Sequence, residues 1–175
     1  AIAVDPVVNS TLLNIGRMIS AAAEQSPIIM GFLLGGIMKM ICTSPLSSMA
    51  LTAMLGLDGL AMGIAAIACV GGSFTNGIIF DRLKLGERSN VIAVMLEPLT
   101  QADIITQNPI PIYGSNFFGG GLAGLAAAML GIINNAPGTA SPIPGLLAPF
   151  GFNPPLKVVA AIVLAAIGGS LAGFV

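Results

Sequence analysis

From Ile104 to Leu156 the chain runs without a charged side chain. A helix needs about 20 residues to cross a membrane, so this stretch is longer than any single crossing. Only 7% of all residues are charged and 55% are hydrophobic, whereas soluble domains carry about 25% charged residues. A soluble domain of this composition could not cover its surface with charge. The sequence therefore predicts an integral membrane protein whose surroundings are the lipid bilayer.

The same composition excludes several classes of function. The net charge of -1 argues against a nucleic-acid partner, which would need a basic patch. The chain has no His, and therefore lacks the commonest general base and a common metal ligand. Cys42 and Cys69 lie in apolar runs without CxxC spacing, as expected of small buried residues. We therefore predict no catalytic residue, no metal site and no cofactor.

Apolar runs and helix-breaking residues divide the chain into successive segments of one transmembrane domain. The predicted fold class is all-α, a polytopic helical bundle with broken helices and re-entrant, hairpin-like segments. Residues 9–25 are partly amphipathic, as in an interfacial or bundle-edge helix. We then expect a broken helix pair at 26–57, a span at 59–80, a charged loop at 81–90, a broken or re-entrant segment at 91–113, a span at 114–133, a re-entrant loop at 134–155 and a span at 156–175.

Two features of this arrangement have more than one interpretation. Pro45 lacks a backbone donor and disfavours helix at Ser44, which favours two half-length helices over one kinked helix. The charged loop 81–90 is expected in the cytoplasm by the positive-inside rule, because it is the one dense charge cluster and contains Arg82, Lys84 and Arg88. Segment 91–113 either crosses the membrane, which places Lys157 in the cytoplasm, or dips and returns, which places Lys157 outside.

Small residues recur one helical turn apart, in the spacing GxxxG. This spacing lets helix backbones approach closely where lipid supplies no hydrophobic drive, and predicts tightly packed helices. The pairs are Gly31/Gly35, Gly59/Gly63, Gly120/Gly124 and Gly169/Gly173.

Polar side chains in three broken or irregular segments are the candidates for a solute site, namely TSPLSS (43–48), EPLTQAD with TQNPIP (97–111) and PGTASPIPG (137–145). Broken helices leave backbone groups free to bind a solute at membrane depth. A carboxylate there costs about 2.5 kcal/mol or more, so Glu97, beside Pro98, is expected to face a cavity or to be protonated. The alternative is that Glu97 is an interfacial loop residue just past a short helix. Lys39, one turn before the TSPLSS break, is expected either to pair with a carboxylate or to snorkel to the interface, and snorkelling is favoured. Hydrogen-bonding groups without Arg suit a neutral polyhydroxy solute, and the predicted substrate-binding residues are Glu97, Gln101, Asn108, Thr139 and Ser141.

Residues 26–66, SPIIMGFLLGGIMKMICTSPLSSMALTAMLGLDGLAMGIAA, carry a resemblance to a known family. The patterns P-I-x-M-G, T-x-P-x-S-S-x-A and L-G-L-x-G-L-A-x-G, with Asn108-Pro109 and the Pro/Gly-rich 134–145, resemble the membrane-embedded IIC component of the bacterial sugar phosphotransferase system. More narrowly, they resemble the branch labelled predicted membrane protein or putative toxin regulator. The chain looks like the C-terminal half of such a protein.

The resemblance implies a multi-pass, usually homodimeric permease of the bacterial inner membrane. It also implies a cytoplasmic IIB partner that phosphorylates the sugar, so that the chain itself is not the catalyst. Well-studied sugar branches use a His with a Glu at the sugar, and this chain has no His. The alternative is a non-transporting membrane regulatory or assembly protein of the same family.

Overall fold

The structure, a computed structural model, describes residues 5–174, and every regular element within that range is helical. This confirms the all-α class. The elements in chain order are α1 (Asp5–Gln25), α2 (Pro27–Thr43), α3 (Ser48–Met54), α4 (Gly59–Arg82), α5 (Arg88–Leu96), the 3-10 turn η1 (Pro98–Gln101), α6 (Ala102–Gln107), α7 (Pro109–Met129), α8 (Pro142–Leu147), the 3-10 turn η2 (Ala148–Gly151) and α9 (Pro155–Gly173).

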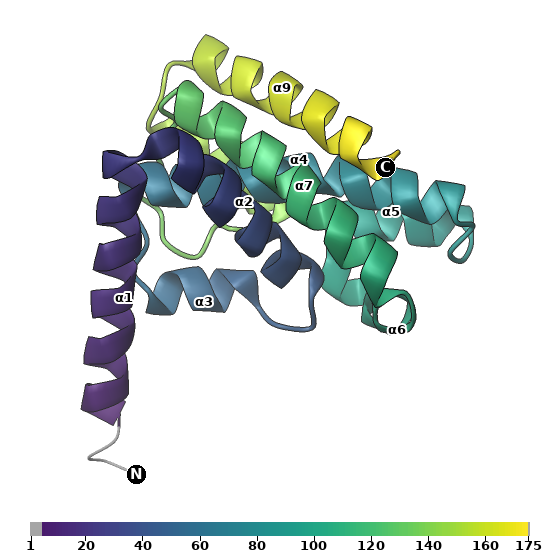
Figure 1. The fold of residues 1–175 in the computed structure, drawn as a ribbon, viewed down its shortest axis with the longest axis horizontal. Helices are drawn as coiled ribbons and strands as arrows, with labels where there is room; N and C mark the ends of the chain where they lie inside the picture. The colour runs from purple at the N-terminus through teal and green to yellow at the C-terminus, as the bar shows by residue number, and fades with distance from the viewer. Residues whose placement is uncertain (1–4, 175) are drawn as a thin grey trace.

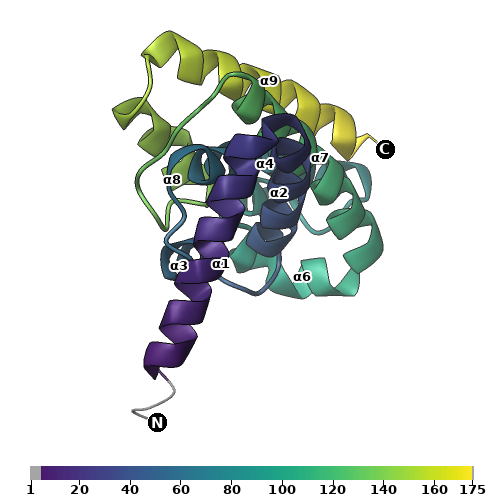
Figure 2. The same ribbon diagram turned by 60° about the vertical axis from the view of Figure 1, so that its left-hand side comes forward.

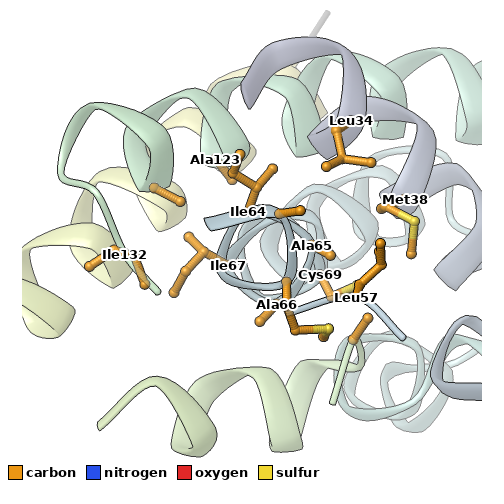
Figure 3. Close-up of a cluster of buried hydrophobic side chains, with 14 of the residues drawn as sticks. Leu34, Met38, Leu57, Ile64, Ala65, Ala66, Ile67, Cys69, Ala123 and Ile132 are labelled. Carbon is orange, nitrogen blue, oxygen red and sulfur yellow. The ribbon is translucent and has the colours of Figure 1, made fainter. Parts of the chain in front are cut away.

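Helix α4 forms the centre of the bundle and packs against α2, α7, α9, α5 and α8 (Figure 1). In its most apolar stretch of 18 residues, 89% of the residues are buried. Figure 3 shows Ile64 of α4 beside Ala123 of α7 and Ile67 on the side of Ile132, with Leu34 of α2 in the same buried cluster. The N-terminal part of α1 projects beyond the bundle in both Figure 1 and Figure 2, while the helix also contacts α2, α3 and α4.

Glycines on both helices allow the close backbone contact between α2 and α7. A Cβ added to Gly35 would lie 2.5 Å from the carbonyl oxygen of Gly120 and 2.9 Å from the Cα of Gly124. Gly31 likewise faces the carbonyl oxygen of Gly124. Two of the GxxxG pairs therefore pack against each other, and the predicted close approach of helix backbones is confirmed at this contact.

Two of the described helices, α4 and α9, are long and apolar enough to cross a membrane by length and composition. In α9 only 39% of the apolar stretch is buried. Its uncovered face carries large hydrophobic side chains, namely Leu156, Val159, Val163, Leu164, Ile167 and Leu171. Soluble monomers rarely expose apolar patches of this kind, and a lipid environment accounts for this face of α9.

Helix boundaries near the prolines differ in part from the expected segments. Helix ends at Thr43 and resumes at Ser48, with Ser44 in extended conformation. Helix α7 begins at Pro109 and ends at Met129, whereas a span over 114–133 was expected. Proline is accepted in a first helical turn because its missing N–H has no partner there. The expected loop 134–155 contains the short elements α8 and η2. Which segments cross the membrane stays a prediction.

Candidate functional site

Glu97 occupies the break between α5 and η1. Its backbone is extended, with φ -151° and ψ 99°, because the ring of Pro98 disfavours the helical conformation in the preceding residue. Its backbone N–H still donates to the carbonyl oxygen of Ala93 at 2.9 Å, so the last turn of α5 keeps an ordinary α-helical hydrogen bond. The side chain is half-buried, and its Oε2 accepts a hydrogen bond from Ser141 Oγ at 3.1 Å.

Ser141 lies at a second break of the same kind. It precedes Pro142 at the start of α8 and is extended, with φ -149° and ψ 158°. Its residue surface is only 3% exposed. The neighbouring Ala140 accepts a hydrogen bond from Ser48 Oγ at 2.5 Å, which joins this segment to α3. Two X-Pro breaks, distant in sequence, therefore meet through their side chains.

A cavity of about 100 Å³ opens where these segments meet. Its wall comes from the end of α2, the beginning of α3, the α5–η1 break and the residue before α8. The lining residues are Cys42, Leu46, Ser47, Ser48, Met49, Glu97, Leu99 and Ser141. Ligand pockets measure about 300–1,000 Å³, so a sugar-sized solute could enter only if the surrounding segments separate.

The other three predicted site residues do not line this cavity. Gln101 Oε1 accepts from Asn90 Nδ2 at 2.6 Å, so it ties η1 to α5. Asn108 Nδ2 donates to the carbonyl oxygen of Ile104 at 3.0 Å, within the turn that ends α6. Thr139 Oγ1 donates to the carbonyl oxygen of Ala136 at 2.7 Å. Their role in binding stays a prediction. In this structure Asn108 and Thr139 bond to nearby backbone carbonyls, and Gln101 bonds to the side chain of Asn90.

Lys39 of α2 does not snorkel, and that expectation is wrong. Its exposed fraction is 0%, and its stem lies against Gly72 of α4 and Gly120 of α7. Snorkelling requires a free path to the interface, and the contact with these two helices closes it. The Nζ atom has no hydrogen-bond partner among the described residues. The sequence could not reveal this burial, because it does not show which glycines face Lys39.

The sequence analysis also did not assign Cys42 and Ser48 to the site. Cys42 lines the cavity from the last turn of α2, and it belongs to the same buried cluster as Cys69 of α4. Both cysteines are free and buried. The available signal was position, since both residues flank the helix break at TSPLSS, whose polar groups were recognised as a candidate region.

The fold and the cavity define a class, namely a helical membrane protein whose polar site lies between helix breaks. The family described as Phosphotransferase system, EIIC matches residues 1–175, and the chain belongs to this family. It is therefore a membrane component of a sugar-transport system, which in general works with a cytoplasmic IIB partner. A search of curated proteins and a search of solved structures each return no match.

Proposed function

We propose that the chain is a permease-type subunit that translocates a neutral polyhydroxy, sugar-like solute. The observation that carries this proposal is the hydrogen bond between Ser141 and Glu97 at the wall of the cavity. It places a carboxylate and a hydroxyl side by side where two broken segments meet. Irregular backbone of this kind is used by transporters to bind solutes at membrane depth.

The chemistry of this pair suits hydroxyl groups. An ionised carboxylate accepts hydrogen bonds through two oxygens, and a serine hydroxyl both donates and accepts. A solute hydroxyl can therefore donate to Glu97 and accept from Ser141 in place of their mutual bond. A phosphate or carboxylate solute would favour Arg, and the arginines among residues 5–174 are exposed.

Several further features belong to the proposal. The solute is phosphorylated by the IIB partner, the subunit is a homodimer, and it lies in the bacterial inner membrane with several crossings. Gln101, Asn108 and Thr139 stay candidates for solute contact, because they belong to the same two segments as Glu97 and Ser141. Those contacts require their present local hydrogen bonds to be exchanged when the cavity widens.

The experiment is a melting-temperature series on purified protein across a panel of neutral sugars and polyols. A solute that binds only the folded protein raises its melting temperature. We expect at least one sugar to stabilise the wild type, and the effect to disappear in Glu97→Gln. Asp103→Asn, an exposed carboxylate in the same segment, is the matched control and should keep the response.

Two results would oppose the proposal. If Glu97→Gln and the wild type respond equally to a stabilising sugar, the site assignment is wrong. A flat response over the whole panel favours the alternative, a non-transporting regulatory or assembly protein.

A further inference from the structure

Lys39 and Glu97 differ from the other charged residues in their burial. Lys39 is the one cationic side chain in residues 8–174 that is fully buried, since the arginines and Lys84 are exposed and Lys157 is half-buried. Glu97 is the one carboxylate in the same range that is not exposed. Within this range Lys39 is therefore the one fully buried charge, while Glu97 and Lys157 are the half-buried ones.

Lys39 and Glu97 are each adjacent to Cys42. Lys39 precedes Cys42 by one turn of α2, and Cys42 lines the same cavity as Glu97. Residues three apart on a helix are neighbours, with about 5–6 Å between their Cβ atoms, so Lys39 is adjacent to Cys42 on α2. Although Lys39 itself does not line the cavity, it is close enough to influence a group in its wall.

The burial of Lys39 is built into the helix packing. Its stem fills the space left by Gly72 of α4 and Gly120 of α7. An ammonium group taken out of water pays a large desolvation penalty, and this one has no hydrogen bond among the described residues to offset it. An opposite charge across a low-dielectric interior is the remaining source of compensation. Glu97, the one carboxylate in residues 8–174 that is not exposed, lines the cavity together with Cys42, one turn of α2 from Lys39.

We propose that Lys39 is a positioning residue whose buried ammonium compensates the Glu97 carboxylate across the cavity wall. The pair gives the site no net charge, which fits a neutral solute and disfavours an ionic one. The statement about the solute rests on the proposed function. The charge compensation itself does not, because it exists in the protein without solute.

The first test compares the melting temperatures of four proteins without solute: wild type, Lys39→Met, Glu97→Gln and the double variant. Methionine is similar in length to the lysine stem, so the space beside Gly72 and Gly120 stays filled. Each single variant leaves one interior charge uncompensated and should melt lower than the wild type. The double variant should recover much of the loss. If the two losses simply add, the proposal is wrong.

The control variant is Lys157→Met. In the wild type, Lys157 Nζ donates to the carbonyl oxygen of Gly131, and the loss of stability in Lys157→Met should not be rescued by Glu97→Gln.

If a single variant cannot be purified, the same comparison uses membrane abundance of a fluorescent fusion, with Lys39→Gln as a second replacement. Higher abundance of the double variants than of the Lys39 single variants supports compensation. Equal loss in single and double variants overturns it.

The second test uses Cys42 as an internal probe. The thiolate is the reactive form of cysteine, and a nearby positive charge favours it while a negative charge disfavours it. Alkylation of Cys42, located by mass spectrometry, should slow severalfold in Lys39→Met and accelerate in Glu97→Gln. A purely steric role of Lys39 would not produce opposite changes, so rates that change in the same direction in both variants contradict the proposal.

These measurements separate the two proposals. If no sugar stabilises the protein but the charges are coupled, only the proposed solute fails. If sugars bind but the coupling is absent, only the role of Lys39 fails.

Discussion

Ser141 Oγ donates a hydrogen bond to Glu97 Oε2 at 3.1 Å, across a separation of 44 positions in sequence. Each residue immediately precedes a proline and has an extended backbone. Besides ending helices, the two prolines therefore favour the extended backbone of Glu97 and Ser141, and in this conformation the two side chains contact each other. The resulting contact joins the α5–η1 break to the segment before α8.

The first prediction concerns Ser141→Ala. Loss of the hydroxyl removes one partner for the solute and for Glu97, which costs about 0.5–1.5 kcal/mol. We expect the dissociation constant for a stabilising sugar to rise by a factor of roughly 10 or less, measured by titration of the melting temperature. Thr106→Ala is the matched control, because Thr106 donates to the carbonyl oxygen of Asp103 and does not line the cavity. A larger loss of affinity in Thr106→Ala than in Ser141→Ala would place the solute elsewhere.

The sequence was sufficient to predict the fold class and to identify Glu97 and Ser141 as candidates. The reasoning rested on strong local effects, namely the scarcity of charge, the cost of a carboxylate in hydrocarbon and the backbone restriction before proline. It could not show that these two side chains meet, because their contact depends on the packing of separate segments. It also could not show that Asn108 and Thr139 would bond to their own turns.

The error at Lys39 has a different cause. A lysine near a helix end commonly reaches the interface when its path is free. Here Gly72 and Gly120 allow α4 and α7 to pack over its stem. That outcome depends on the rotation of three helices about their axes, which local sequence does not specify.

The second prediction concerns the accessibility of the two thiols. Cys42 lines the cavity, whereas Cys69 is 0% exposed and lies in the apolar core. A small alkylating reagent should label Cys42 in the folded protein and leave Cys69 unlabelled, as read by mass spectrometry. A stabilising sugar should slow labelling of Cys42, while a sugar that does not stabilise serves as the control. Faster labelling of Cys69 than of Cys42 would contradict the described packing.

The third prediction tests the contact between α2 and α7. Alanine in place of Gly35 would put a methyl group against the backbone of Gly120 and Gly124, and overpacking of this kind costs about 1–3 kcal/mol. We expect a lower melting temperature despite the better helix propensity of alanine. Gly114→Ala is the control on α7, because a Cβ there meets nothing within 4 Å; its melting temperature should stay equal or rise. Equal effects of the two substitutions would show that α2 and α7 are not in backbone contact.

The fourth prediction concerns Asn76 of α4 and Asn116 of α7, both 0% exposed. Asn116 Nδ2 donates to Asn76 Oδ1 at 2.6 Å and also to the carbonyl oxygen of Ile112 at 2.8 Å. Asn76 Nδ2 and Asn116 Oδ1 have no partner among the described residues. The two ends of this interhelical bond are therefore unequal, since only Asn116 has a second bond for its amide.

This inequality predicts different costs for two substitutions of similar size. Asn116→Leu removes the only hydrogen-bond partner of Asn76, and a buried polar group left unsatisfied costs about 1–3 kcal/mol. In Asn76→Leu, Asn116 keeps its bond to Ile112, so the loss should be closer to the average of about 0.6 kcal/mol for an interhelical hydrogen bond in a membrane protein. The double variant should be no less stable than Asn116→Leu, because it leaves no buried amide. Unfolding in detergent, followed for all three variants, gives the order; a greater loss for Asn76→Leu than for Asn116→Leu would show that the bond between α4 and α7 is arranged differently.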